Sequence, residues 1–111
     1  MKTVRILSCA EAELAEAIDY YNGECAGLGY ALAAEVKTTL NRISAFPEAW
    51  PRLSARARRG LVGRFPYGIL YQVHGDEILV LAIMHLRRAP VRWAERLAAA
   101  TPEAEDPKPA R

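Results

Sequence analysis

Residues 68–84 contain the sequence Gly-Ile-Leu-Tyr-Gln-Val-His-Gly-Asp-Glu-Ile-Leu-Val-Leu-Ala-Ile-Met. The first part, residues 68–73, is rich in β-forming residues, and the last part, residues 77–84, is apolar almost throughout. Between them, Gly75-Asp76 is a two-residue connection of the type II′ kind. A strand that is apolar on both faces is typical of the centre of a covered sheet. The segment therefore predicts an antiparallel hairpin whose second strand lies centrally.

A third strand of the same sheet is predicted just upstream, over residues 61–65, with Pro66 as the interruption. Before it, residues 47–60 have no clear period and contain Pro47, Pro51 and Gly60, so we expect a surface loop. The part of the chain from 61 to 84 is thus predicted to be a three-stranded antiparallel meander.

Two amphipathic helices are predicted before this loop. Ser8 and Glu11 have the spacing of a capping box, which predicts a helix start. Gly27-Leu28-Gly29 interrupts the helical pattern, and Phe46-Pro47 ends the second helix. The apolar residues at helical spacing are Leu14, Ala17, Ile18, Tyr21 and Cys25 in the first helix and Leu32, Val36, Leu40 and Ile43 in the second. A short glycine turn between two helices predicts an antiparallel helical hairpin.

The two ends of the chain complete the predicted fold. Residues 3–7 alternate and favour an opening strand, whereas a short last helix is expected from about Val91. Residues 98–111 form a Pro-rich, charged tail that we expect to be disordered. The prediction is an α+β domain over residues 1–97, with an N-terminal strand, an α-helical hairpin, the three-stranded antiparallel meander and a short C-terminal helix.

Composition fits one globular domain, since 51% of the 111 residues are hydrophobic and 25% are charged. There is no apolar run of about 18 residues and no stretch like the apolar part of a signal peptide, so we expect a soluble cytoplasmic protein. Cys9 and Cys25 lack the spacing of a zinc site. We expect both to be reduced, packed thiols and predict no metal or cofactor.

Charge is unevenly distributed along the chain. Residues 1–48 hold four basic and seven acidic residues, whereas residues 49–97 hold nine basic and three acidic ones. Between Glu48 and Asp76 there is no acidic residue, and the five basic residues are all arginines: Arg52, Arg56, Arg58, Arg59 and Arg64. Arginine has a planar, permanently charged fork that suits carboxylate or phosphate. This region therefore predicts an acidic peptide or a nucleic acid as partner.

Short motifs in a fixed order carry a resemblance to a known family. They are an Ala-rich helix with Tyr20-Tyr21, Phe46-Pro47, Arg59-Gly60, Phe65-Pro66-Tyr67, Tyr71, and the ending His85-x-x-Arg88-x-Pro90-x-x-Trp93. Together they resemble the RelE/ParE superfamily of bacterial type II toxins over residues 3 to 97, and most closely its ParE-like, plasmid-stabilisation branch. The resemblance implies a toxin that inhibits DNA gyrase and is neutralised by a co-encoded antitoxin with an acidic C-terminal segment. The alternative that it implies is a RelE-like endonuclease that cuts mRNA on the ribosome.

The residues favour the gyrase inhibitor over the nuclease. The resemblance implies that RelE-like nucleases draw on lysines, arginines and a C-terminal Tyr or His. Here the arginines are present, but the only lysines are Lys2, Lys37 and Lys108, and no tyrosine follows Tyr71. If the chain is a ribonuclease, its catalytic candidates are Arg58, Arg59, Arg64 and His85, with Tyr67 as a possible pair for His85. The predicted partner-binding residues are Arg52, Arg56, Arg58, Arg59, Arg64, Arg87 and Arg88.

Both histidines and the aromatic residues also have purely structural interpretations. We expect His85 to be a hydrogen-bonded histidine that holds the turn at Arg87-Arg88, and His74 to be a solvated residue of the hairpin. Among the aromatic residues, we expect Tyr21 and Trp50 to pack in the core and Tyr20 to be exposed. An open edge of the sheet would let the antitoxin add a strand, with a helix in an adjacent groove.

Overall fold

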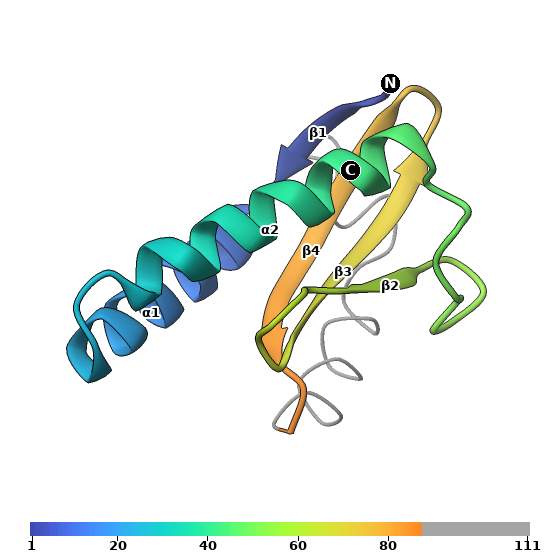
Figure 1. Cartoon of the computed structure of the whole chain (residues 1–111). Helices are drawn as coiled ribbons and strands as arrows, with labels where there is room; N and C mark the ends of the chain where they lie inside the picture. Colours follow the sequence, from blue (N-terminus) through green and yellow to red (C-terminus); the bar gives the residue numbers. More distant parts are fainter. Residues whose placement is uncertain (88–111) are drawn as a thin grey trace.

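The computed structural model describes residues 1–87. In chain order the elements are β1 (Thr3–Ile6), α1 (Ser8–Glu24), α2 (Leu28–Ala45), β2 (Arg58–Leu61), β3 (Tyr67–His74) and β4 (Glu77–His85). The strands form one sheet in the order β1-β4-β3-β2, in which β1 is parallel to β4 and the other neighbours are antiparallel (Figure 1). This confirms the predicted α+β order. The predicted helix from Val91 and the predicted tail lie outside the described residues.

The central hairpin is built as its sequence predicts. β4 lies between β1 and β3, and seven of its nine residues are buried, which explains its apolar composition. Gly75 has a φ of 60°, a left-handed conformation that glycine adopts without steric cost in such a turn. A bulge shifts the register, because Leu70 pairs with Ala82 whereas Tyr71 pairs with Val80.

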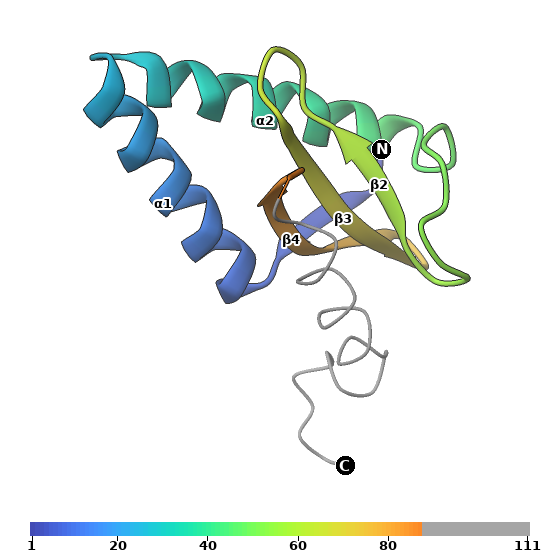
Figure 2. The ribbon, with the colours of Figure 1, turned by 90° about the horizontal axis from the view of Figure 1, so that it is seen from below.

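The helical hairpin covers one face of the sheet (Figure 2). On this face Leu32, Val36 and Ile43 of α2 belong to the same apolar cluster as Ile69 and Val80 of the sheet. The cluster also includes Ala10 and Ala17 of α1. The opposite face carries a second cluster, made of Ala57, Leu70, Leu79, Leu81, Ala82 and Met84, against which Leu7 and Leu86 pack. Both faces of the sheet are therefore apolar, as expected for a covered sheet.

The turn between the helices depends on a glycine that allows close contact. A Cβ atom at Gly29 would lie only 2.1 Å from the carbonyl oxygen of Ile18, so a side chain cannot fit without displacing α1 from α2. The Gly29 amide also donates to Asn22 Oδ1 at 2.7 Å. Gly27, which precedes α2, has a φ of 87°. These contacts set the position of α1 relative to α2.

The prediction for the start of α1 is wrong. The capping box does not form, because Ser8 is already the first residue of α1 and Leu7 precedes the helix without a side-chain cap. The Leu7 amide donates to Val80 O at 3.1 Å, and the Leu7 carbonyl accepts from the Glu11 amide at 3.0 Å. Pairing with β4 thus continues up to Leu7, and the helix follows at once.

The third strand of the meander also lies elsewhere than predicted. β2 occupies Arg58–Leu61 rather than residues 61–65, and so the preceding loop is shorter than residues 47–60. β2 passes close to α2, since a Cβ at Gly60 would come within 2.9 Å of Ile43 Cδ1 and the Ile43 side chain would have to shift. The stretch from 62 to 66 forms the connection to β3, in which Arg64 has a φ of 70°.

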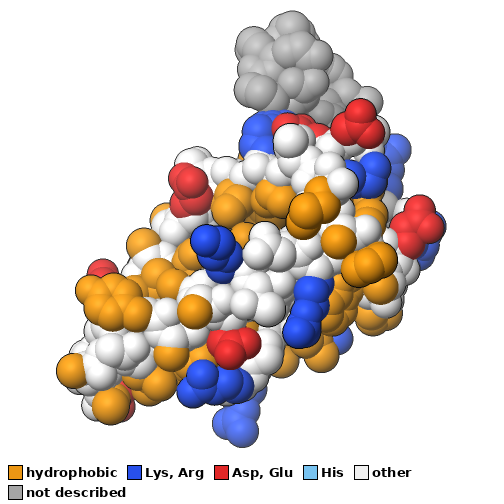
Figure 3. Space-filling view, turned by 45° about the horizontal axis from the view of Figure 1, so that its top comes forward, with side chains coloured by type: hydrophobic (Ala, Val, Ile, Leu, Met, Phe, Trp, Pro, Cys, Tyr) orange, Lys and Arg blue, Asp and Glu red, His pale blue; other side chains and the backbone are white. Residues whose placement is uncertain are grey.

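The surface differs from the prediction at both cysteines. Within the described residues Cys9 and Cys25 form no disulfide, and both are exposed rather than packed. Cys9 Sγ lies 3.7 Å from the carbonyl oxygen of Leu81, the residue that the register of the bulge skips. On the face in Figure 3, charged side chains of both signs are scattered among exposed hydrophobic ones. Neither α1 nor α2 is long and apolar enough to cross a bilayer.

Candidate functional site

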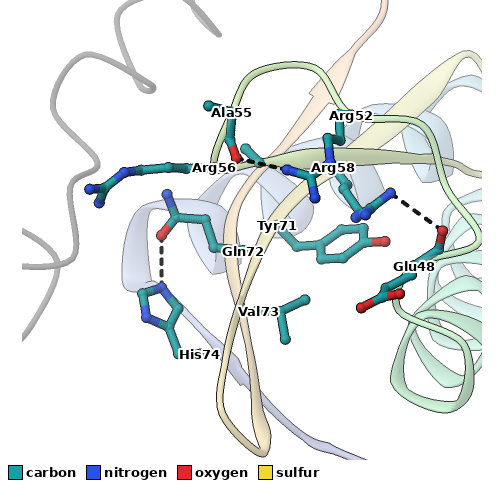
Figure 4. A pocket seen from close by; sticks show the side chains of 10 residues that line it. Glu48, Arg52, Ala55, Arg56, Arg58, Tyr71, Gln72, Val73 and His74 are labelled. Atoms are coloured by element: carbon teal, nitrogen blue, oxygen red, sulfur yellow. Dashed lines mark hydrogen bonds between the residues drawn. The ribbon is translucent and has the colours of Figure 1, made fainter.

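The structure brings part of the arginine-rich region together around one pocket (Figure 4). We call it the arginine pocket, and it is lined by Glu48, Arg52, Ala55, Arg56, Ala57, Arg58, Tyr71, Gln72, Val73 and His74. Its volume is about 360 Å³. The three arginines and one glutamate among these residues give the pocket a net positive charge. Such a site suits a carboxylate or a phosphate group.

The loop before β2 is folded back so that its arginines join those of the strand. Arg52 forms an isolated antiparallel bridge with Arg58, and the Arg59 amide donates to Pro51 O at 3.2 Å. Arg52 Nη1 also donates to Ala55 O at 2.9 Å. The backbone therefore holds residues 51–55 against the outer edge of β2. β2 is one of the two edge strands of the sheet, and an added strand from a partner would have to replace this contact.

Arg58 has a structural role in addition to its charge. Its Nη1 atom donates to Trp50 O at 2.6 Å and to Glu48 O at 3.3 Å, which fixes the start of the loop. A guanidinium carries five N–H donors, so these bonds leave donors on the other nitrogens of the group for an anion. Arg56 is exposed, and in Figure 4 its side chain reaches sideways, away from Tyr71. Arg58 is thus the fixed cation of the pocket and Arg56 the extended one.

Tyr71 anchors the inner wall of the pocket. Its side chain is buried, and its hydroxyl donates to Pro47 O at 2.6 Å, which ties the end of α2 to β3. Burial raises the pKa of Tyr71 to about 12, while the neighbouring charge of Arg58 acts in the opposite direction and is the smaller effect. The hydroxyl therefore stays protonated at neutral pH. It is a hydrogen-bond donor that shapes the pocket rather than a proton carrier.

Gln72 and His74 form the polar side of the pocket. Gln72 is buried, and its Oε1 lies 2.8 Å from His74 Nε2. This hydrogen bond joins two polar side chains that strand alternation places on the same face of β3. His74 is half-buried and hydrogen-bonded, which corrects the prediction that it is simply solvated. Neither residue was predicted for the site, and their alternation along β3 was the only sequence signal that places them together.

The remaining predicted arginines lie outside the arginine pocket. Arg59 follows Arg58 on the same strand, so its side chain points to the other face of the sheet. Arg64 Nη1 lies 3.7 Å from Glu35 Oε2, and its guanidinium carbon lies 5.7 Å from the centre of the Phe65 ring. Arg87 lines a different groove, and Arg88 lies outside the described residues. Of the predicted partner-binding arginines, the arginine pocket therefore contains Arg52, Arg56 and Arg58.

The candidates for ribonuclease chemistry lie in different surroundings. Arg58 lines the arginine pocket, Arg64 is paired with Glu35, and His85 lines a groove beside α1. His85 Nδ1 accepts from the Arg87 amide at 3.1 Å, and its ring packs edge-on against Tyr67 with 5.3 Å between centroids. This is the bonding expected of a histidine that holds the turn. General acid–base cleavage needs its groups within hydrogen-bond reach of one substrate.

Within residues 1–87, no group of three or more His, Cys, Asp and Glu side chains is placed to hold a metal ion.

Comparison with known proteins assigns the chain to a family. Residues 4–90 match the family model described as the ParE toxin of the type II toxin-antitoxin system parDE. The chain belongs to this ParE toxin family. A solved structure titled "Chromosomal ParDE TA system from P. aeruginosa" is similar to the ParE-family chain with a TM-score of 0.69 and 18% sequence identity. The match covers 78% of this chain and 97% of that one, and it shows a shared fold. No curated protein sequence matches the chain.

Proposed function

We propose that this ParE-family chain is a toxin that inhibits DNA gyrase when free and is kept inactive by a co-encoded antitoxin. The observation that carries the proposal is the family match over residues 4–90, which reaches from within β1 to beyond the end of β4. Gyrase as target comes from the ParE branch of the superfamily. An inhibitor of this kind acts by binding, so it requires a surface rather than a catalytic centre.

The arrangement of residues supports binding over catalysis. The candidate nuclease residues are dispersed between the arginine pocket, the Glu35 ion pair and the groove beside α1. Tyr71, the tyrosine of the pocket, is held protonated by burial and donates to a backbone carbonyl. A ribosome-dependent nuclease would need at least one acid and one base that converge on a phosphodiester.

The arginine pocket is the proposed site for acidic residues of the antitoxin. Arg52, Arg56 and Arg58 offer several N–H donors in a small region, and a guanidinium can bind a carboxylate through two parallel hydrogen bonds. A single exposed ion pair contributes little, about 0–1 kcal/mol, so the expected affinity comes from the group of arginines and the adjoining surface. Because residues 51–52 already pair with the outer edge of β2 at Arg58 and Arg59, we expect side-chain contacts there rather than strand addition.

The test is a pair of assays on the same preparation of the free protein. We would measure supercoiling by purified gyrase and, separately, cleavage of mRNA on translating ribosomes, each with and without the co-encoded antitoxin. The proposal predicts loss of supercoiling, intact mRNA and recovery of supercoiling when the antitoxin is added. Cleaved mRNA with normal supercoiling would overturn it in favour of a RelE-like nuclease.

A further inference from the structure

The positive charge of the arginine pocket is not neutralised by the described residues around it. Glu48 is the acidic residue of the lining, against three arginines. Within residues 1–87, none of Arg52, Arg56 and Arg58 forms a salt bridge with an acidic side chain. The sequence also holds no acid between Glu48 and Asp76. Because a guanidinium stays charged at every physiological pH, the pocket attracts anions permanently.

The shape of the pocket follows from the place where β2 begins. β2 pairs with β3 as far as Arg58 opposite Tyr71, so residues 72–74 of β3 extend past the last residue pair. The loop beside this space is closed on itself, since the Leu53 amide donates to Ala57 O at 2.8 Å. Its backbone therefore has a defined shape in the free protein. A ligand of the pocket would pay little for ordering this loop.

The three arginines of the pocket spread their charge over a surface. Arg58 is held in place by two backbone carbonyls, and Arg52 Nη1 donates to a third at 2.9 Å. Arg56 is exposed and extends to the side away from Tyr71 (Figure 4). Such a spread suits a ligand with successive negative charges, and duplex DNA carries one charge per about 1.7 Å of its axis.

The walls of the pocket contribute little apolar or aromatic surface. Tyr71 is fully buried, so its ring is not available to stack on a base. Ala57 is 2% exposed, and Val73 is 39% exposed. The volume of about 360 Å³ is at the lower end of the range for small-molecule sites, which fits a phosphate group rather than a base pair. Contacts to phosphates position a protein on DNA without reading its sequence.

A second depression, between α1 and the end of β4, has the opposite charge. We call it the α1–β4 groove, and its volume is about 760 Å³. It is lined by Glu13, Glu16, Ala17, Tyr20, Tyr21, Glu24, Leu28, Tyr67, Ile83, Met84, His85 and Arg87, and shares no residue with the arginine pocket. In Figure 2, α1 and β2 lie on opposite sides of the molecule. Because the three glutamates repel phosphates, DNA at the pocket would leave the groove turned away from it.

We infer that the arginine pocket of the free toxin binds the phosphate backbone of the duplex DNA on which gyrase acts, an inference that rests on the proposed function. Arg52, Arg56 and Arg58 would donate to phosphate oxygens, and binding would not depend on base sequence. These contacts would add to those that the toxin makes with gyrase itself. The pocket can take carboxylates of the antitoxin in the inactive complex and phosphates in the free toxin, because both present anionic oxygens.

The test removes one positive charge from the pocket and, separately, one from outside it. The pocket variant is Arg56→Gln, which leaves the bonds of Arg52 and Arg58 intact. The matched control is Lys37→Gln, since Lys37 is an exposed cation of α2 that lines neither the pocket nor the groove. Both variants change the net charge by one. Arg56→Lys keeps the charge and should restore binding. Thermal unfolding establishes that each variant is folded.

The probe is a fluorescently labelled duplex of about 30 base pairs and arbitrary sequence, and its affinity for the full-length toxin is measured by anisotropy from about 50 to about 200 mM salt. Three phosphate contacts predict that the wild type loses about 40-fold in affinity over this range. Arg56→Gln should lose only about 12-fold and should bind about tenfold more weakly at the lower salt. Lys37→Gln should keep the wild-type salt dependence and stay within about twofold.

A second readout uses gyrase. The toxin concentration that halves supercoiling is measured for the same variants. Arg56→Gln should raise this concentration about threefold or more, and Lys37→Gln should leave it within about twofold.

The outcomes separate this inference from the proposed function. If the wild type inhibits supercoiling but Arg56→Gln keeps the wild-type salt dependence, the inference is overturned and the proposed function stands. Equal losses in Arg56→Gln and Lys37→Gln would show an effect of net charge and would also overturn it. So would an Arg56→Gln variant that binds DNA normally and the antitoxin more weakly, because the pocket would then serve the antitoxin alone. If the wild type does not inhibit supercoiling, the proposed function and the inference fail together.

Discussion

The arginine pocket and the α1–β4 groove differ in how their charged residues are held. In the pocket, Arg52 and Arg58 donate to backbone carbonyls of the loop that carries the charge, so the cations also stabilise the loop. In the groove, Glu16 and Glu24 are positioned by the regular period of α1. A site on a loop is therefore sensitive to its hydrogen bonds, whereas a site on a helix is sensitive to how the helix packs. Changes to the pocket should therefore act through its hydrogen bonds, and changes to the groove through the packing of α1.

The largest effect is expected from Gly29→Ala, which disrupts the packing of α2 against α1. The new Cβ would lie 2.1 Å from Ile18 O, and backbone atoms cannot yield as a flexible side chain can. We expect a loss of about 3 kcal/mol or more in the free energy of unfolding, measured by chemical denaturation. The control is Gly23→Ala, because a Cβ at Gly23 meets nothing within 4 Å. Equal stability of the two variants would contradict the packing account.

An intermediate effect is expected from Tyr71→Phe, which removes the hydroxyl group of a side chain that lines the arginine pocket. The variant loses the hydrogen bond to Pro47 O and leaves that carbonyl without this donor. We expect the free energy of unfolding to fall by about 1–2 kcal/mol. Antitoxin affinity should fall as well, because the end of α2 is no longer tied to the pocket. A variant as stable as the wild type would show that this bond is unimportant.

Tyr71 also predicts a dependence of stability on alkaline pH. Its pKa is raised to about 12 in the folded protein, above the ordinary value of 10.0, so the folded state keeps a proton that the unfolded state releases. The associated stability is present below pH 10 and is lost as the pH rises from about 10 through about 12. Thermal unfolding across this range should show the loss in the wild type and a smaller loss in Tyr71→Phe. If the wild type and Tyr71→Phe lost stability equally over this range, Tyr71 would not be the group responsible.

A smaller effect, on binding alone, is expected from Arg56→Glu. Arg56 is exposed and extends from the pocket, so its reversal should leave the free energy of unfolding unchanged within about 0.5 kcal/mol. We expect antitoxin affinity to fall about tenfold at low salt, with a smaller loss at high salt. Lys37→Glu on α2 is the control, since Lys37 is an exposed cation outside both sites. An equal loss in both variants would indicate a general effect of net charge.

The smallest effect is expected from His85→Ala. The variant loses the bond from the Arg87 amide and the ring contact with Tyr67, at a cost of about 1 kcal/mol. If the protein acts by binding, inhibition of supercoiling by the folded variant should stay within about twofold of the wild type. Complete loss of toxicity in a variant of normal stability would instead give His85 a direct role in activity.

Much of the fold could be predicted, because its strongest signals are local. The apolar run of β4, the Gly75-Asp76 turn and the two helical stripes each follow from short-range periodicity. The position of β2 could not be predicted, since short-range periodicity does not show which of residues 58–66 pair with β3. The capping box failed for a similar reason, because the pairing of Leu7 with Val80 decides where α1 begins.

The sequence predicts that the candidate site is rich in arginine, but it does not predict which arginines lie together. The acid-free interval identified the arginines, yet the bridge between Arg52 and Arg58 decides which of them share a pocket. Strand alternation alone could have separated Arg58 from Arg59. The groove was not predicted from the sequence. The spacing of Glu13, Glu16, Tyr20 and Glu24 was the signal that could have found it.

The most direct test of two separate, oppositely charged surfaces is the toxin concentration that halves supercoiling by gyrase. The measurement compares Arg56→Gln in the pocket with a groove variant, Glu16→Gln with Glu24→Gln. The account predicts that Arg56→Gln raises this concentration about threefold or more, whereas the groove variant stays within about twofold of the wild type, because the groove is turned away from the DNA. A groove variant that loses inhibition while Arg56→Gln keeps it would contradict the account.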